Sequence, residues 1–181
     1  MTESTLLAHD HSELDAALAA LVAALAEGDA ARSLEHLDLF WARLAVHIRA
    51  ENIHLFPVLL RAAEASRGSA PAAGAPEPKE IRNLVAQLRD DHDFFMSELT
   101  AAVKQLRALS RSGQPDGLRE VREKIDAVSR RLDTHNALEE SRVYHWAAVL
   151  LDPPEQIALN ESIRQELENL PSRFRKPGED G

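Results

Sequence analysis

The chain of 181 residues contains no cysteine, and aromatic residues make up only 4% of it. The absence of cysteine excludes a disulfide scaffold, a thiolate zinc site and iron–sulfur ligation. The apolar runs are far shorter than the roughly 20 residues that a membrane-spanning helix needs. The N-terminal residues lack the basic start and the apolar run of a signal peptide. We therefore expect a cytoplasmic protein without a membrane partner.

Basic residues are also scarce: 21 Lys and Arg stand against 30 Asp and Glu, which gives a formal net charge of −9. An acidic surface repels phosphate backbones, so we expect no nucleic-acid partner. Hydrophobic residues make up 44% of the chain, enough for one domain with a sizeable core. A composition in which Ala and Leu abound favours an all-α protein.

Apolar residues recur every three or four positions through four long segments, which predicts four amphipathic helices. The first segment stops at Gly28-Asp29, and the second contains Pro57, where the loss of a backbone hydrogen bond predicts a kink. A stretch rich in Pro, Gly and Ala at about 66–78 predicts a linker between the two pairs of helices. A turn is expected at 113–116.

The expected fold is therefore all-α, an antiparallel four-helix bundle with a short additional C-terminal helix. Asp152 can cap that extra helix, with Pro153 at its first position and an end near Leu170. We expect residues 1–151 to form the bundle domain, and residues 152–181 to form the C-terminal helix and a polar tail.

One pattern of histidine and glutamate occurs twice: a lone histidine on one predicted helix, then a His-x-x-x-Glu pair on the next. Its members are His11, His47 and Glu51 in the first half, and His92, His135 and Glu139 in the second. The lone histidines are 81 residues apart and the pairs are 88 apart, which suggests an internal duplication. All six positions fall on the apolar stripes, so we expect all six side chains to face the core.

Two inward carboxylates need a compensating charge, because burying a charged group in an apolar core is costly. No lysine lies on the inward stripes near them. Four imidazoles and two carboxylates suit a pair of transition-metal ions. A single inward histidine is more often a hydrogen-bonded core residue, and a Glu beside a His can be a simple ion pair. Six such residues in duplicated spacing on four helices favour a shared metal site.

These residues resemble the pattern of the hemerythrin-like, or HHE cation-binding, family, over roughly residues 5–150. The resemblance extends to the aspartate before each lone histidine and to the run Asn52-Ile-His-Leu-Phe-Pro57. It implies a non-haem di-iron centre with an oxo or hydroxo bridge. By the same resemblance the four histidines are terminal ligands and the two glutamates bridge the irons, with Glu140 a weaker alternative to Glu139. Manganese and zinc suit the same donors.

Oxygen-carrying hemerythrins differ from this pattern, since their third helix carries His-x-x-x-His and their fourth His-x-x-x-x-Asp. Met96 stands here where the fifth histidine would be. Counting coordination positions leaves about two open, which favours reaction with a small oxidant over protected storage. His54 lies on the expected inward stripe, where it could supply a fifth histidine ligand or line a channel.

Other polar and aromatic residues have plainer expected roles. Asp10 and Asp91 could orient ligand imidazoles or be ordinary solvated residues. His9, His36 and His145 are expected at or near the surface. The aromatic residues that flank the ligand positions are expected in the core, where some could form a dry wall. They are Phe40, Trp41, Phe56, Phe94, Phe95, Tyr144 and Trp146.

The leading hypothesis is a cytoplasmic di-iron protein that binds or reduces dioxygen, peroxide or nitric oxide, and catalase-like or oxidase activity is compatible with it. One alternative is a non-enzymatic iron-binding or redox-sensing module that acts through a protein partner. Another is an iron-centre repair protein, disfavoured because those proteins usually carry an added cysteine-containing N-terminal domain. A metal-free bundle is the remaining alternative. The sequence names no catalytic residue and no oligomeric state.

Overall fold

The computed structural model of the protein describes residues 3–65, 75–112 and 117–174. Within these ranges the chain forms helices and no strand, so the prediction of an all-α protein is confirmed. Most of the predicted linker and the whole predicted turn at 113–116 lie outside the described residues. Residues 75–77 lead directly into the next helix at Pro78.

The chain reverses direction between the first two helices, α1 (Glu3–Glu27) and α2 (Ala30–Arg49). Gly28 adopts a φ of +80°, a left-handed conformation that is strained for any residue with a Cβ. Asp29 then caps α2, because its side chain accepts a hydrogen bond from the backbone N–H of Arg32 at 3.0 Å. The predicted stop at Gly28-Asp29 is thus confirmed.

Two of the four predicted long helices contain a π-helical turn that the sequence analysis missed. The second consists of α2, η1 (Ala50–Leu55) and α3 (Phe56–Ala65). The fourth consists of α5 (Leu118–Leu138), η3 (Glu139–Val143) and α6 (Tyr144–Leu150). The third predicted helix is α4 (Pro78–Ser112), which lies between α3 and α5 in the chain. The second interruption contains no proline, so proline is not the common cause of the two. Turns of this kind are frequent at functional sites.

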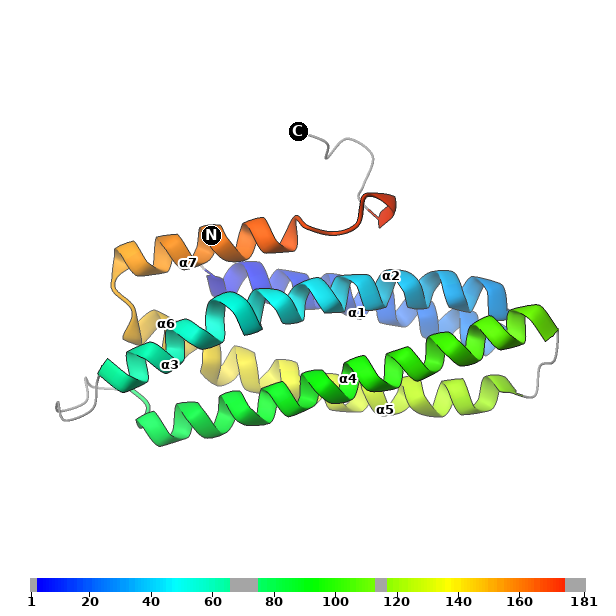
Figure 1. Ribbon diagram of the computed structural model, residues 1–181, viewed down its shortest axis with the longest axis horizontal. Coiled ribbons are helices and arrows are strands. Elements are labelled where there is room, and N and C mark those ends of the chain that lie inside the picture. The colour runs from blue at the N-terminus through cyan, green and yellow to red at the C-terminus, as the bar shows by residue number, and fades with distance from the viewer. Residues whose placement is uncertain (1–2, 66–74, 113–116, 175–181) are drawn as a thin grey trace.

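Four helices, α1, α2, α4 and α5, lie side by side along the long axis of the molecule (Figure 1). Each packs against the next in this order, and α5 packs back against α1. The apolar core consists of two clusters, one with Leu14, Leu44 and Leu132 and the other with Leu7 and Val143. Between these clusters along each helix lie the histidines and glutamates of the repeated pattern, so a polar layer separates two apolar ones.

The last long helix, α7 (Pro153–Leu167), lies along the outside of the bundle beside α1 and α2 and packs against η1 (Figure 1). Asp152 caps it through a reciprocal pair of hydrogen bonds with Glu155, at 2.9 and 3.0 Å. The helix ends at Leu167 rather than near Leu170. Leu159 and Ile163 anchor it in the second apolar cluster. A 3-10 turn at Ser172–Phe174 follows it.

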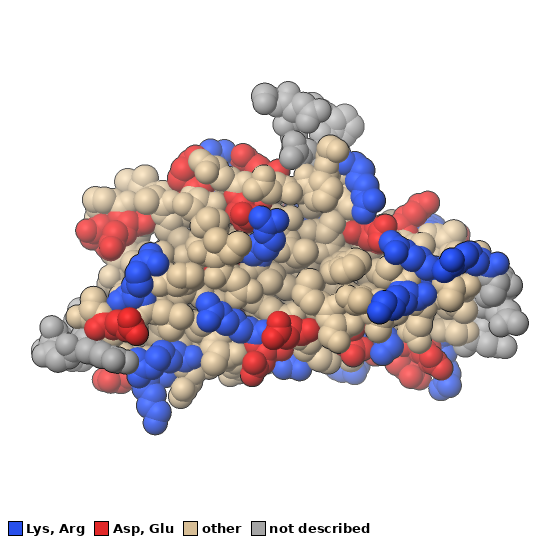
Figure 2. Space-filling view, viewed as in Figure 1, with Lys and Arg blue, Asp and Glu red and all other residues tan. Residues whose placement is uncertain are grey.

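The surface shown in Figure 2 carries acidic and basic side chains interspersed over the helices. This face is therefore neither predominantly acidic nor predominantly basic. None of the helices in the described residues is both long and apolar enough to cross a membrane.

Candidate metal centre

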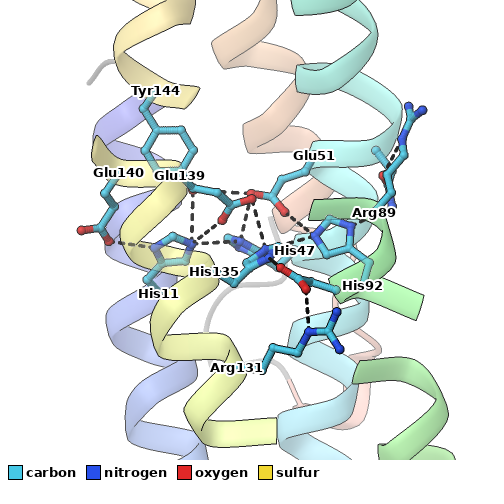
Figure 3. Close-up of polar contacts among 12 residues, drawn as sticks. His11, His47, Glu51, Arg89, His92, Arg131, His135, Glu139, Glu140 and Tyr144 are labelled. Atoms are coloured by element: carbon cyan, nitrogen blue, oxygen red, sulfur yellow. Dashed lines mark hydrogen bonds and ion pairs between the residues drawn. The ribbon is translucent and has the colours of Figure 1, made fainter. Parts of the chain in front are cut away.

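The structure brings all six residues of the repeated pattern into one buried cluster (Figure 3). Each is at most 2% exposed to solvent. The histidines come from the four long helices, whereas both glutamates come from the π-helical turns. They are His11 on α1, His47 on α2, Glu51 on η1, His92 on α4, His135 on α5 and Glu139 on η3.

The first group of donor atoms lies on the α1–α2 side of the cluster and comprises His11, His47, Glu51 and Glu139. The two Nε2 atoms of His11 and His47 are 3.2 Å apart. Nε2 of His47 lies 3.3 Å from Oε1 of Glu51. Nε2 of His11 lies 3.4 Å from Oε2 of Glu139. Four potential ligand atoms from four elements therefore face one point.

The second group lies on the α4–α5 side and reuses both glutamates, together with His92 and His135. The two Nε2 atoms of these histidines are 3.2 Å apart. Oε2 of Glu51 lies 3.2 Å from His92, and Oε1 of Glu139 lies 3.2 Å from His135. Each carboxylate thus directs one oxygen to each group, as a bridging ligand of two ions would.

The donor spacing fits octahedral metal ions. Bonds of about 2.1 Å place neighbouring ligand atoms of such an ion about 3 Å apart. The observed separations of 3.2 to 3.4 Å are close to that value. Oε2 of Glu51 and both carboxylate oxygens of Glu139 are buried without a hydrogen-bond partner. Imidazole nitrogens lie 3.2 to 3.4 Å from these three oxygens, at ion-pair distance but outside hydrogen-bond geometry, which suits donors that point at a shared cation.

The outer ring nitrogens are held by polar side chains. Nδ1 of His47 lies 2.9 Å from Oδ2 of Asp10, and Nδ1 of His135 lies 3.2 Å from Oδ2 of Asp91. A neutral imidazole that donates its Nδ1–H to a carboxylate keeps its lone pair on Nε2. The converging Nε2 atoms are thereby set up as metal ligands.

The two aspartates orient imidazoles, and they do so across helices. Asp10 precedes His11 in the chain but contacts His47, and an Arg43 guanidinium 3.0 Å away holds its other oxygen. Asp91 likewise precedes His92 and contacts His135. The lone histidines are held by the residues that follow the glutamates of the opposite half.

Glu140 holds His11 on its outer side, with Oε1 2.8 Å from Nδ1. Its side chain is half exposed and lies away from the converging atoms, so it is not positioned as an alternative to Glu139. The amide nitrogen of Asn52 lies 3.1 Å from Nδ1 of His92. The oxygen of the same amide accepts from Nε of Arg89 at 3.4 Å.

The placement of His54 on the inward stripe is wrong. Its imidazole is partly exposed and faces α7, with Nε2 3.7 Å from a carboxylate oxygen of Glu166. A π-helical turn takes more residues than an α-helical one. The residues after Glu51 therefore face other directions than they would if the α-helical period of α2 continued. Met96 packs against the first apolar cluster.

One residue at the cluster was missed as a site residue. Tyr144, the first residue after η3, directs its hydroxyl into the centre (Figure 3). Its oxygen lies 3.2 Å from Nε2 of His11 and 3.5 Å from Oε1 of Glu51. Burial, together with the nearby carboxylates Glu139 and Glu51, raises the pKa of this phenol well above its usual value in the metal-free protein. The only available signal was a lone tyrosine close after the second glutamate.

In the metal-free protein the cluster balances its charge with protons. Burial alone would raise the pKa of Glu51, but His47 and then His92 hold it well below its usual value. Burial alone would lower the pKa of His135, but Glu139 and further carboxylates raise it to about 9. The pKa of His47 is raised for similar reasons. Imidazolium–carboxylate pairs thus occupy the place that metal ions would take.

Metal binding is therefore expected to release protons. Because the pKa of His135 is raised to about 9, its proton stabilises the metal-free fold fully below about pH 6.5. That contribution is lost as the pH rises through about 9. A metal ion needs the neutral imidazole, so affinity for Zn²⁺ should rise over this window. Calorimetric titration in buffers of different ionisation enthalpy counts the protons, and binding without proton release would contradict the expectation.

A comparison with protein families matches this chain to the hemerythrin HHE cation-binding domain over residues 2–147. No curated protein and no solved structure matches the chain. The matched segment contains all six residues of the cluster and Tyr144.

Proposed function

Because the chain belongs to the hemerythrin HHE cation-binding domain family, we propose that it is a non-haem di-iron protein that binds or reacts with a small oxidant. Dioxygen, hydrogen peroxide and nitric oxide are the candidate ligands. The observation that carries the proposal is the pair of four-donor groups that share the carboxylates of Glu51 and Glu139. This sharing supports a stoichiometry of two ions per chain.

Nitrogen and oxygen donors of this kind suit iron, and they also suit manganese and zinc. Membership of the family favours iron. Two iron ions would supply the electrons that a small oxidant accepts, which no side chain of this cysteine-free protein can readily do. The protein's own contribution is to hold six donors in place, to fix the imidazole tautomers and to limit the access of water.

Aromatic rings surround the second donor group on two sides. Phe56 stacks on the imidazole of His92 at 5.8 Å between ring centroids, with an angle of 9° between the planes. Phe95 meets His135 edge to face at 5.4 Å. Both phenylalanines are fully buried. These rings exclude water from that side, which strengthens electrostatic interactions in the cluster.

The proposal includes the finer architecture as well. The helices α1, α2, α4 and α5 would form an antiparallel four-helix bundle within a domain of residues 1–151, with α7 and the tail added to it. A cytoplasmic location and the absence of a nucleic-acid partner also remain predictions, supported by the composition and the net charge of −9.

One observation favours the second candidate function, a redox-sensing or iron-sensing module. Helix α7 packs against η1, the turn that carries Glu51. The buried carboxylate of Glu166 on α7 pairs with Arg49 at 2.9 Å, next to that turn. A change in metal occupancy that shifts Glu51 would therefore reach an outer helix, where a protein partner could detect it.

The experiment that tests the proposal is to load the purified protein anaerobically with Fe²⁺, measure metal per chain and record the visible spectrum with each oxidant. We expect about two irons per chain and a spectrum that changes with peroxide, dioxygen or nitric oxide. His135→Ala should abolish the change, because it removes a donor from one group, whereas His36→Ala, on α2 but in neither donor group, should not. Catalytic peroxide consumption would favour an enzyme, and a spectral change without turnover would favour a sensor. Failure of the protein to bind iron would overturn the proposal.

A further inference from the structure

Tyr144 lies at the first donor group as a ligand would. Its hydroxyl oxygen is 3.2 Å from Nε2 of His11 and 3.5 Å from Oε1 of Glu51. Within the same group, the distances between the other donors are 3.2 to 3.4 Å. The phenol oxygen therefore has the spacing of a neighbouring ligand on one ion, rather than that of a side chain stacked outside the cluster.

The π-helical turn η3 puts Tyr144 in this position. The backbone N–H of Tyr144 donates to the carbonyl of Glu139, five residues earlier. This bond aligns Tyr144 with Glu139 on one face of the helix. In a regular α-helix the residue aligned with Glu139 would be Val143, and Tyr144 would point in another direction.

The first half of the duplicated pattern has the same turn with a different residue. The backbone N–H of Phe56 donates to the carbonyl of Glu51, so Phe56 is the counterpart of Tyr144. Each ring lies against the lone histidine of the opposite half. The ring centroids of Tyr144 and His11 are 5.9 Å apart, and those of Phe56 and His92 are 5.8 Å apart. At this position the two halves differ by a single atom, because Phe56 has no hydroxyl.

We propose that the hydroxyl oxygen of Tyr144 is a ligand of the ion held by His11 and His47, and that the small oxidant binds at the other ion, beside Phe56. The inference rests on the proposed di-iron function and adds to it a seventh ligand side chain and a binding position. The first ion then has five donors from the protein and the second has four. When the phenol binds, its O–H bond breaks, an oxygen–metal bond forms and the proton leaves to solvent.

The experiment uses the fact that Tyr144 is the only tyrosine in the chain. A phenolate bound to Fe³⁺ gives an intense visible charge-transfer band, and resonance Raman excitation in that band enhances the ring vibrations. We expect both signals in the ferric wild-type protein and loss of both in Tyr144→Phe, with two irons retained. The matched swap, Tyr144→Phe with Phe56→Tyr, should restore the band, because it places the phenol at the other ion.

Loss of the phenol should also open a second binding position. Nitric oxide added to the diferrous wild-type protein should bind at one iron per chain, and Tyr144→Phe should take up a second equivalent. Incorporating ring-deuterated tyrosine into the wild-type protein gives a readout that needs no variant to fold, since the enhanced vibrations must shift. Two bound irons without a tyrosine-derived signal would overturn this inference and leave the proposed function standing. A protein that binds no iron would overturn both.

Discussion

Replacement of Glu51 with alanine should reduce the bound metal from two ions per chain to one or none. Its two oxygens face different donor groups, at 3.3 Å from His47 and 3.2 Å from His92, so its loss removes one ligand from each ion. Removal of a residue that only hydrogen-bonds to a metal ligand already weakens metal binding by about 10–100-fold. Loss of a bridging ligand should weaken it by more.

The matched control is Glu64→Ala, because Glu64 is exposed on α3 in the same long helix. The two variants are compared by metal analysis after anaerobic loading with Fe²⁺ and gel filtration, and by circular dichroism to check the fold. Glu51→Ala should keep its helical spectrum, since the imidazoles it leaves behind become neutral when they lose their counter-charge. Two ions per chain retained in a folded Glu51→Ala protein would show that the carboxylate does not bridge them.

Removal of metal is expected to produce the largest change in thermal stability. An ion that binds only the folded protein adds about 2.7 kcal/mol when free metal exceeds Kd by 100-fold. Two independent ions would add about 5 kcal/mol, and a chain of this size shifts its Tm by roughly 2–4 °C per kcal/mol. Loading should therefore raise Tm by roughly 10–20 °C, as measured by calorimetry with and without a chelator.

The same shift should disappear in the Glu51→Ala protein, which separates binding at the cluster from weak binding elsewhere. Zn²⁺ is a suitable second ion, because it has no redox chemistry and fits the same donors. An equal rise in Tm for the wild-type and variant proteins would place the stabilising ions outside the cluster. Absence of any rise, with two ions bound, would show that the unfolded chain binds metal as well as the folded one does.

The helical fold and the membership of the cluster were accessible from the sequence. A helical period near 3.6 residues puts positions i and i+4 on one face, so His47 with Glu51 and His135 with Glu139 could be assigned to the core from spacing alone. The turn at Gly28 could be read in the same way, because it depends on residues adjacent in the chain. These predictions needed only local geometry and the high cost of an uncompensated buried charge.

Contacts between helices were beyond such reasoning. Asp10 and Asp91 could be suspected as partners of imidazoles, but only the packing of α1 on α2 and of α4 on α5 shows that their partners are His47 and His135. The sequence also leaves Glu140 open as a metal ligand, since it does not say which ring nitrogen of a histidine a nearby carboxylate will reach. In the structure Glu140 reaches the outer nitrogen of His11.

What the sequence by itself determined is therefore the all-α class and the set of six residues in the core, because both follow from periodicity along single helices. Only the tertiary structure decided which way the residues after the two glutamates face. The two π-helical turns break the 3.6-residue period, turn His54 away towards α7 and bring Tyr144 to the donor atoms. The backbone hydrogen bonds of a π-helical turn are less favourable than those of an α-helix, so the turn persists only where the surrounding packing compensates. The local sequence therefore carried no signal for it.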